Sequence, residues 1–213
     1  MRDAGSDGHL QRNAPAAPEG NAPAELRWRE TGRRRLAELS VFDIWAARRV
    51  SPAGQEGEFC IIQTPDWVNV VPVLRGARGE ERFLMVRQFR QGAGIVTTEF
   101  PAGLAEPGED PRDTALRELS EETGQAAGRL TLIGKVAPNP AFMTNWCYTY
   151  LAEDLFPSAG AHADELELLE TREVDARELA GCIGTGEYVN SLVLVAWMLY
   201  RDYAGRERGA DRN

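Results

Sequence analysis

The stretch GLAEPGEDPRDTALRELSEETG, residues 103–124, decides the fold of this chain. Its second half predicts a short helix with a clear start and end. Asp110 is a suitable N-cap, Pro111 follows at the first helical position, where its missing N–H costs nothing, and Gly124 can end the helix. Apolar and small residues recur at helical spacing, which predicts one buried face: Ala115, Leu116, Leu119 and Thr123.

The opposite face of the predicted helix is acidic. Glu118, Glu121 and Glu122 stand at positions i, i+3 and i+4, so their carboxylates converge on one patch. Like charges at this spacing cost roughly a few tenths of a kcal/mol per pair, and a hard divalent cation, which prefers oxygen ligands, is the natural compensation. Arg117, four residues before Glu121, can orient one of the carboxylates. The acidic pattern alone leaves open the alternative of a solvated helix face.

The spacing of the fixed positions within residues 103–124 favours the metal site. A glycine, five residues, a glutamate, seven residues and then R-E-L-x-E-E-x-G is the spacing of the Nudix box, which is matched here by Gly103, Glu109, Arg117, Glu118, Leu119, Glu121, Glu122 and Gly124. Gln125 replaces the apolar residue that usually follows. The chain therefore resembles the Nudix hydrolases, from roughly Val41 to Tyr200. The resemblance implies an α/β fold, an α/β/α sandwich with a mixed sheet, preceded here by a small N-terminal antiparallel β region.

Two further features narrow the resemblance. The segment Glu99-Phe-Pro-Ala-Gly103 is similar to the E-x-P-A-G entry of ADP-ribose and nucleoside-diphosphate-sugar pyrophosphatases. Pro140 lies about where ADP-ribose pyrophosphatases carry a proline, although Asn145 stands where those enzymes often have an acidic residue. Hydrolysis of ADP-ribose to AMP and ribose 5-phosphate is the activity that this implies. Another nucleoside-diphosphate sugar, or another dinucleotide, remains an alternative substrate.

The resemblance also implies roles for the residues of the box. The main-chain carbonyl of Ala102 and the carboxylates of Glu118 and Glu122 would hold Mg²⁺, with Glu121 assisting and Mn²⁺ as a possible substitute. Glu109 and Arg117 would pair and brace the loop against the helix. These roles are chemically consistent, because a pyrophosphate must be neutralised before water can attack its phosphorus, and Mg²⁺ takes carboxylate and water ligands.

The remaining site residues are expected outside the box. In related enzymes the general base is a glutamate on a loop well after the box, which matches Glu165 here, with Glu167 as the second choice. Arg90 resembles the arginine that contacts phosphate in the family, and Pro140 belongs to the substrate-binding stretch. Trp67 is the expected aromatic platform for the base. Phe42 and Trp45 are alternatives, and each of these three aromatic residues could equally belong to the core.

Composition excludes some partners. The 213 residues carry a formal net charge of −9 and a pI of about 4.9, which argues against nucleic acid and anionic membranes as partners and disfavours an RNA-directed hydrolase. No apolar run reaches transmembrane length. The three cysteines, at positions 60, 147 and 182, are predicted to be buried free thiols in a reducing cytoplasm. The alternative hypothesis is a Nudix module that senses a nucleotide without hydrolysing it, but the complete set of box glutamates favours an enzyme.

The chain is expected to have four parts: a disordered tail (1–25), an N-terminal β region (26–64), the Nudix domain (65–204) and a frayed tail (205–213). By position, the N-terminal region fits the role of a homodimer interface, as is typical of the resembling enzymes. Within it, the Arg-rich residues 26–39 are expected to be a solvated segment before the first strand. Strands are expected at 41–50, 58–63, 66–74, 82–90, 97–103, 130–136 and 146–153, a loop at 164–172, and helices at 174–179 and 191–203. The last helix has an expected core stripe of Leu192, Val195, Leu199 and Tyr203.

Overall fold

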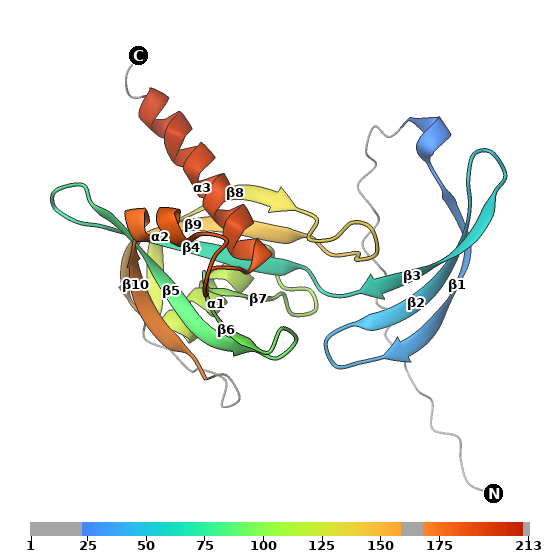
Figure 1. Cartoon of the computed structure of the whole chain (residues 1–213), viewed down its shortest axis with the longest axis horizontal. Coiled ribbons are helices and arrows are strands. Elements are labelled where there is room, and N and C mark those ends of the chain that lie inside the picture. Colours follow the sequence, from blue (N-terminus) through green and yellow to red (C-terminus); the bar gives the residue numbers. More distant parts are fainter. Residues whose placement is uncertain (1–22, 159–167, 211–213) are drawn as a thin grey trace, which may run out of the picture. The chain divides into compact units, whose positions relative to one another are not determined.

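The computed structural model describes residues 23–158 and 168–210, and the chain divides into two compact units (Figure 1). The first unit is the chain up to Thr64 together with Ala141–Thr144. The second unit is Pro65–Pro140 together with the chain from Asn145 onward. None of the helices in the described ranges has the length and apolar character needed to cross a membrane.

The first unit is a three-stranded antiparallel sheet with the order β1-β2-β3. A short 3-10 helix, η1 (Ala24–Leu26), precedes β1 (Arg29–Glu38), β2 (Asp43–Val50) and β3 (Glu56–Gln63). Ala141–Thr144 joins this sheet, because the Ile62 amide donates to the Phe142 carbonyl at 2.7 Å and the Thr144 amide to the Ile62 carbonyl at 3.1 Å. Residues 29–38 are therefore a full strand, which corrects the expected solvated lead-in. Arginine side chains of this strand stack on the Trp45 ring, and the Arg33 guanidinium carbon lies 5.6 Å from the ring centroid.

The first unit buries little apolar surface. Only Ala46, Ala47 and Ile61 are buried apolar residues among its described positions. Several large apolar side chains remain exposed instead: Leu26, Trp28, Leu36, Leu39, Val41, Phe59 and Phe142. A three-stranded sheet needs a covered hydrophobic face for independent stability. The sheet of the first unit is thus not completed by the residues of its own unit.

The second unit is built on a mixed seven-stranded sheet. Its strands are β4 (Trp67–Arg75), β5 (Glu81–Arg90), β6 (Ile95–Glu99), β7 (Ala102–Leu104), β8 (Gln125–Val136), β9 (Cys147–Pro157) and β10 (Glu170–Asp175). The order is β10-β5-β4-β9-β8, with β6 paired to β5 and β7 to β4. The β4–β9 pair is parallel and all other pairs are antiparallel. The predicted mixed sheet and the small N-terminal antiparallel region are both confirmed.

Helices cover both faces of this sheet (Figure 1). On one face α1 (Pro111–Thr123) buries Ala115 and Leu119 against Val68, Val70 and Tyr150. On the other face α2 (Ala176–Cys182) and α3 (Ser191–Ala210) pack on a larger core. In that core the Phe83 ring meets three aromatic neighbours edge to face at 5.0 to 5.8 Å: Phe100, Trp197 and Tyr200. The α/β/α sandwich implied by the sequence resemblance is therefore present.

The strand predicted at 97–103 is divided in two. β6 ends at Glu99, and Phe100 is buried in the core. The Pro101 carbonyl accepts a hydrogen bond from the Val70 amide at 2.8 Å. Proline has no N–H for a strand ladder, so a break at this position is expected from its chemistry. The chain therefore changes partner from β5 to β4, and this brings Ala102 and Gly103 beside α1.

Two predicted elements near the C-terminus need correction. Residues 174 and 175 end strand β10 rather than begin a helix, because the buried side chain of Val174 pairs opposite Phe83. Asp175 then caps α2 by accepting from the Arg177 amide at 2.8 Å. Glu170–Arg172 are likewise strand, not loop. The expected fraying from Gly205 is also wrong as far as Ala210, where α3 ends.

The core face of α3 lies one position from the predicted stripe. The buried residues are Val193, Ala196, Trp197, Tyr200 and Ala204, whereas the predicted residues flank them and are only partly buried. The large aromatic side chains of α3 face the sheet and so set its rotation. Among the cysteines, Cys147 is buried and Cys182 is half-buried, but Cys60 is exposed, which corrects the expectation that all three are buried.

Candidate functional site

The predicted helix forms as the sequence indicated. Asp110 accepts from the Arg112 amide at 2.8 Å, Pro111 stands at the first turn, and Gly124 ends the helix in the left-handed conformation with φ of 67°. A left-handed residue at this position favours glycine, because it has no β-carbon to clash. The capped helix fixes the angular positions of the three box glutamates that follow Arg117.

Arg117 is the centre of the site. Its guanidinium pairs with Glu109 through Nε–Oε1 and Nη2–Oε2 contacts of 3.1 Å each. Nη1 contacts Glu118 at 2.7 Å and Glu121 at 2.9 Å, and Nη2 donates to the Leu104 carbonyl at 3.0 Å. One arginine therefore ties the box loop to two consecutive turns of α1. The expected pairing of Glu109 with Arg117 is present, and it is one part of a larger network.

This network shifts the titration of both partners. Hydrogen bonds from Arg117 are the main cause that lowers the pKa of Glu109 to about 2, helped by the Glu106 amide and Thr114 against a smaller opposing effect of burial. Reciprocally, Glu109 is the main cause that raises the pKa of Arg117, with contributions from Glu118 and Glu121. Each group stays charged in its partner's presence, as expected for charge-assisted hydrogen bonds.

Gly103 leaves the space that the Glu118 carboxylate occupies. A β-carbon at position 103 would overlap the carboxyl group of Glu118, so only glycine permits the side chain of Glu118 to lie against the backbone of β7. The side chain of Glu118 is 12% exposed. The first glycine of the box is thus explained by close approach, since its φ is not in the left-handed region.

Glu122 is held on the same short strand. Its side chain is buried, and Oε2 accepts from the Ala102 amide at 2.9 Å. Ala102 is therefore bonded through its N–H to one box carboxylate, while Gly103, the next residue, lies against another. The structure brings together the backbone at 102–103 and the carboxylates of Glu118 and Glu122.

The donor set at this position suits a divalent cation. Within residues 23–158 and 168–210 no group of three or more acidic, histidine or cysteine side chains is already arranged so that it could hold a metal ion. However, Arg117 is one cation among four box carboxylates, and two of these carboxylates lie against the polar backbone of β7: Glu122 at the Ala102 amide, and Glu118 in the space that Gly103 leaves free. Carboxylate and carbonyl oxygens are the ligands that hard divalent cations prefer, so the residues fit such an ion.

The other predicted site residues lie elsewhere in the second unit. Arg90, at the end of β5, forms a bidentate pair with the buried Glu99, with distances of 2.9 and 2.7 Å. Trp67 begins β4, opposite Leu104, and its indole N–H has no hydrogen-bond partner among the described residues. Pro140 is exposed in the turn after β8. Glu165 and Glu167 lie outside the described residues.

Glu99 is a residue whose role the sequence did not reveal. Burial alone would raise its pKa, but hydrogen bonds from Arg90, Asn190 and Thr97 together lower it. The Thr97 hydroxyl donates to the Glu99 carboxylate at 2.5 Å. Glu99 therefore orients the Arg90 guanidinium three residues before Ala102. The only sequence signal was its place in the E-x-P-A-G segment.

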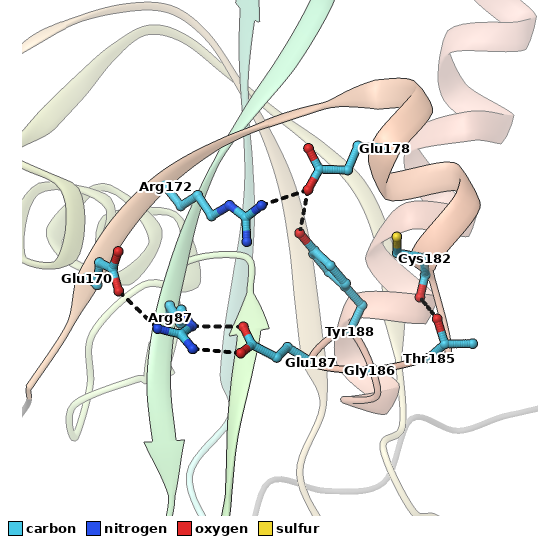
Figure 2. Close-up of a pocket in the computed structure, with 9 residues that line it drawn as sticks. All are labelled: Arg87, Glu170, Arg172, Glu178, Cys182, Thr185, Gly186, Glu187 and Tyr188. Atoms are coloured by element: carbon cyan, nitrogen blue, oxygen red, sulfur yellow. Dashed lines mark hydrogen bonds and ion pairs between the residues drawn. The ribbon is translucent and has the colours of Figure 1, made fainter.

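A second charged cluster lines a cavity of about 420 Å³ between β5, β10 and the segment before α3 (Figure 2). Arg87 forms a bidentate pair with Glu187 at 2.8 and 2.7 Å and a third bond with Glu170 at 3.2 Å. Arg172 bonds Glu178 at 2.8 Å, and the Tyr188 hydroxyl donates to the same carboxylate at 3.3 Å. Both arginines of this cavity are thus neutralised by protein carboxylates. Neither arginine stands in a sequence motif that indicates a site.

Comparison with known proteins identifies the family of the chain. The family model of the NUDIX domain matches residues 65–188. The ADP-ribose pyrophosphatase of Bacillus subtilis is 36% identical over 135 residues, which cover 63% of this chain and 71% of that protein. The methanol dehydrogenase activator of Bacillus methanolicus is 31% identical over 163 residues, covering 76% and 83%. A crystal structure of an ADP compounds hydrolase superposes with a TM-score of 0.75 at 21% identity, covering 85% of this chain and 97% of the other, which shows a shared fold.

These matches agree with the box geometry around Arg117, since the matched region contains the whole box and the β6–β7 segment that meets it. The Nudix family consists of hydrolases that generally use divalent metal ions, and the donor set at Ala102, Glu118 and Glu122 is of that kind. This chain belongs to the Nudix hydrolase family.

Proposed function

We propose that the protein hydrolyses ADP-ribose at its pyrophosphate, giving AMP and ribose 5-phosphate. In this reaction water adds to one phosphorus, the bond from that phosphorus to the bridging oxygen breaks, and the other phosphate leaves. The relative named as an ADP-ribose pyrophosphatase supports this substrate class. Other nucleoside-diphosphate sugars and dinucleotides are the alternative substrates.

One observation carries the proposal: the carboxylates of Glu118 and Glu122 are both held against the backbone at Ala102 and Gly103. This arrangement concentrates negative charge beside a polar backbone edge. Such a concentration is costly unless a cation compensates it, and the bound cation can in turn attract a phosphorylated ligand. A sensor that only binds nucleotide would not need the complete set of box carboxylates.

We propose Mg²⁺ as the cation, held by the Ala102 carbonyl, Glu118 and Glu122 with Glu121 assisting, and with Mn²⁺ able to replace it. When bound, the cation neutralises the pyrophosphate oxygens and so makes the phosphorus accessible to water. Arg117 orients Glu118 and Glu121 and, through Glu109, fixes the loop after Gly103. The protein thus supplies a preorganised set of charges at the reacting phosphates.

The remaining roles rest on the sequence resemblance. Glu165 is proposed as the general base that takes the proton of the attacking water, with Glu167 as the second choice. Arg90, oriented by Glu99, is proposed to contact a substrate phosphate. Trp67 is proposed as the platform for the base, with Pro140 in the substrate-binding stretch. The indole N–H of Trp67 is buried and has no hydrogen-bond partner in the described ranges, while the residue as a whole is only partly buried.

We further propose that the protein is a homodimer that acts in the cytoplasm, without nucleic acid or membrane as a partner. The incomplete burial of the first unit supports the dimer, because its sheet leaves Trp28, Leu36 and Phe59 exposed. The net charge of −9 disfavours nucleic acid and anionic membranes as partners. The three free cysteines agree with a reducing cytoplasm. A monomer mass by light scattering at micromolar concentration would contradict the dimer.

The function is tested by a phosphate-release assay coupled to a phosphatase. ADP-ribose, ADP-glucose, GDP-mannose, UDP-glucose, NADH and diadenosine polyphosphates are compared with Mg²⁺ and with EDTA. The expected result is metal-dependent hydrolysis of ADP-ribose well above the others. Preference for another compound would change the substrate within the family. No turnover of any compound by a folded protein, together with a thermal shift from one of them, would favour the sensing module.

A further inference from the structure

A cavity of about 730 Å³ lies at the end of the second unit opposite the box. Arg75, the last residue of β4, lines it, whereas Trp67 at the start of the same strand pairs with Leu104 beside the box. Eight residue steps along a strand span about 26 Å. The cavity is thus separate from the proposed catalytic site. Its volume is within the range of small-molecule sites.

The floor of the cavity contains two buried polar groups. Glu153 is 3% exposed, and its carboxylate lies between Arg75 at 2.5 Å and Arg129 at 2.8 Å. Tyr200 is 1% exposed, and burial, helped by the nearby Glu81 carboxylate, raises the pKa of its hydroxyl. Among the described residues this hydroxyl makes no hydrogen bond of normal geometry. A buried hydroxyl without a hydrogen bond of normal geometry is unfavourable, so a ligand or water is expected to meet it.

Two arginines on the rim are free to bind a ligand. The Arg177 guanidinium has no carboxylate partner in the described part of the chain. Arg208 uses only Nε, which donates to the Ala204 carbonyl at 3.1 Å. Together with Arg75 and Arg129, whose side chains are 50% and 55% exposed, they surround the cavity with guanidinium N–H donors.

Most of the carboxylates that line the cavity are already bonded to the protein. Glu153 holds its two arginines, and Glu81 lies 3.6 Å from Arg75. Asp175 caps α2, and Glu80 accepts from the amide of Arg78 at 3.1 Å within the β4–β5 turn. Glu207 is the remaining acidic residue. The donors that are left for a ligand are therefore mainly arginine N–H groups and one tyrosine hydroxyl.

The cavity shown in Figure 2 provides a contrast. Its two arginines are both paired with carboxylates, and its buried tyrosine, Tyr188, has a partner in Glu178. An anion there would have to displace protein carboxylates. In the larger cavity, an anion could bind Arg177 and Arg208 without breaking an existing ion pair.

We propose that the cavity lined by Tyr200, Arg129, Arg177 and Arg208 binds a small organic phosphate monoester. Planar guanidinium groups match phosphate oxygens with paired hydrogen bonds, and the Tyr200 hydroxyl can donate a further one. The aromatic rings of Tyr200 and Tyr203 line the space beyond the phosphate and fit an organic part of the ligand. This site is independent of the proposed function.

The experiment measures binding without turnover. Ribose 5-phosphate is titrated calorimetrically into the Glu122→Gln protein in EDTA, so that the box site has no metal through which to bind it. Saturable binding is expected. The double variant Arg177→Ala/Arg208→Ala on the same background should bind at least about tenfold more weakly, because both guanidinium groups without a carboxylate partner are lost. Arg206→Ala is the matched control, since this exposed α3 residue pairs with Asp202 and does not line the cavity.

A second variant separates binding from folding. Tyr200→Phe removes only the hydroxyl without a partner, so the ligand-free protein should keep its melting temperature or gain slightly. Its affinity for ribose 5-phosphate should fall. No binding by the Glu122→Gln protein, or equal affinity of that protein and the double arginine variant, would overturn the proposal. Because no hydrolysis is measured, failure of the proposed function would leave this result interpretable.

Discussion

Two arginine–carboxylate clusters of the second unit look alike and differ in charge balance. Arg87 meets two carboxylates, and its contact with Glu187 is a closed bidentate pair (Figure 2). Arg117 meets three carboxylates, with a fourth, Glu122, held close by on Ala102. The first cluster is nearly neutral and is complete as it stands. The second has a large surplus of negative charge in a partly buried position.

This difference shows why a similar set of bonds leads to two roles. A bidentate arginine pair at the surface joins distant segments, here β5 and the residues before α3, and needs nothing further. A surplus of convergent carboxylates is unfavourable without a cation, so its persistence indicates a site that binds one. Charge excess, and not the number of ion pairs, therefore separates the candidate active site from the structural cluster.

The largest expected effect is at Glu122. Glu122→Gln keeps an oxygen that can accept from the Ala102 amide, so the fold should persist while a charged ligand for the cation is lost. Turnover should fall by at least about 100-fold, since even outer-shell changes at metal sites cost 10–100-fold. The measurement is kcat for ADP-ribose with Mg²⁺, beside a melting curve. Glu106→Gln, at an exposed glutamate in the loop between β7 and α1, is the control and should be as active as the parent.

If Glu122→Gln were as active as the parent protein, the assignment of the surplus charge to a cation would be wrong. If the variant failed to melt cooperatively, the loss of activity would report on folding instead, and Glu118→Gln would then be the variant to examine.

Removing the central arginine should have a smaller effect on activity and a visible effect on stability. Arg117→Ala leaves Glu109, Glu118 and Glu121 without their shared partner, so kcat should fall by about 10–100-fold. The free energy of unfolding should fall by about 1–3 kcal/mol, seen as a melting temperature lower by several degrees. Arg112→Ala, at an exposed position of the same helix, is the control. Full activity of Arg117→Ala would show that the glutamates need no orientation.

The local parts of this site could be predicted from the sequence. Asp110, Pro111 and Gly124 act through bonds to residues within four positions, so the helix and the convergence of its glutamates followed from spacing alone. The close approach of Gly103 to Glu118 is also encoded within the box. Identification of these residues therefore needed no knowledge of the sheet.

The non-local parts could not be predicted in the same way. Arg87 and Glu187 are 100 residues apart, and neither stands in a motif with a known spacing. Val174 appeared helical because its place in β10 depends on pairing with Phe83 across the sheet. The rotation of α3 was misjudged by one position, because it depends on the packing of Trp197 and Tyr200 around Phe83. Tertiary contacts decide this strand pairing and this helix rotation, and local sequence patterns contain no information about those contacts.

The Arg87 cluster should affect stability without affecting catalysis. Arg87→Ala and Glu187→Gln should each lower the melting temperature, and the double variant should lose less than the sum of the two, because the pair is a single interaction. The kcat for ADP-ribose should stay at the parent value in all three proteins. A loss of activity of more than about tenfold would break the comparison, since it would place this cluster in the reaction.

The smallest expected effect is a pH dependence shared by both clusters. Glu109 and Glu187 each have their pKa lowered from 4.5 to about 2, mainly by Arg117 and by Arg87, respectively. Because the folded pKa lies below the unfolded value, the unfolded chain binds the proton first on acidification. The stability that each carboxylate contributes is therefore complete above pH 4.5 and is lost as the pH falls from 4.5 towards 2.

Glu109→Gln and Glu187→Gln should each have a shallower decrease in unfolding free energy across this window than the parent, with a constant difference at neutral pH. Chemical denaturation at a series of pH values measures this, with Glu106→Gln as the control. Added Mg²⁺ should then distinguish the clusters, because at neutral pH it should stabilise the parent and Glu187→Gln equally, whereas in the Glu122→Gln protein the stabilisation should be lost. Parallel curves for the parent and both carboxylate variants would mean that neither arginine sets the acid stability of the fold.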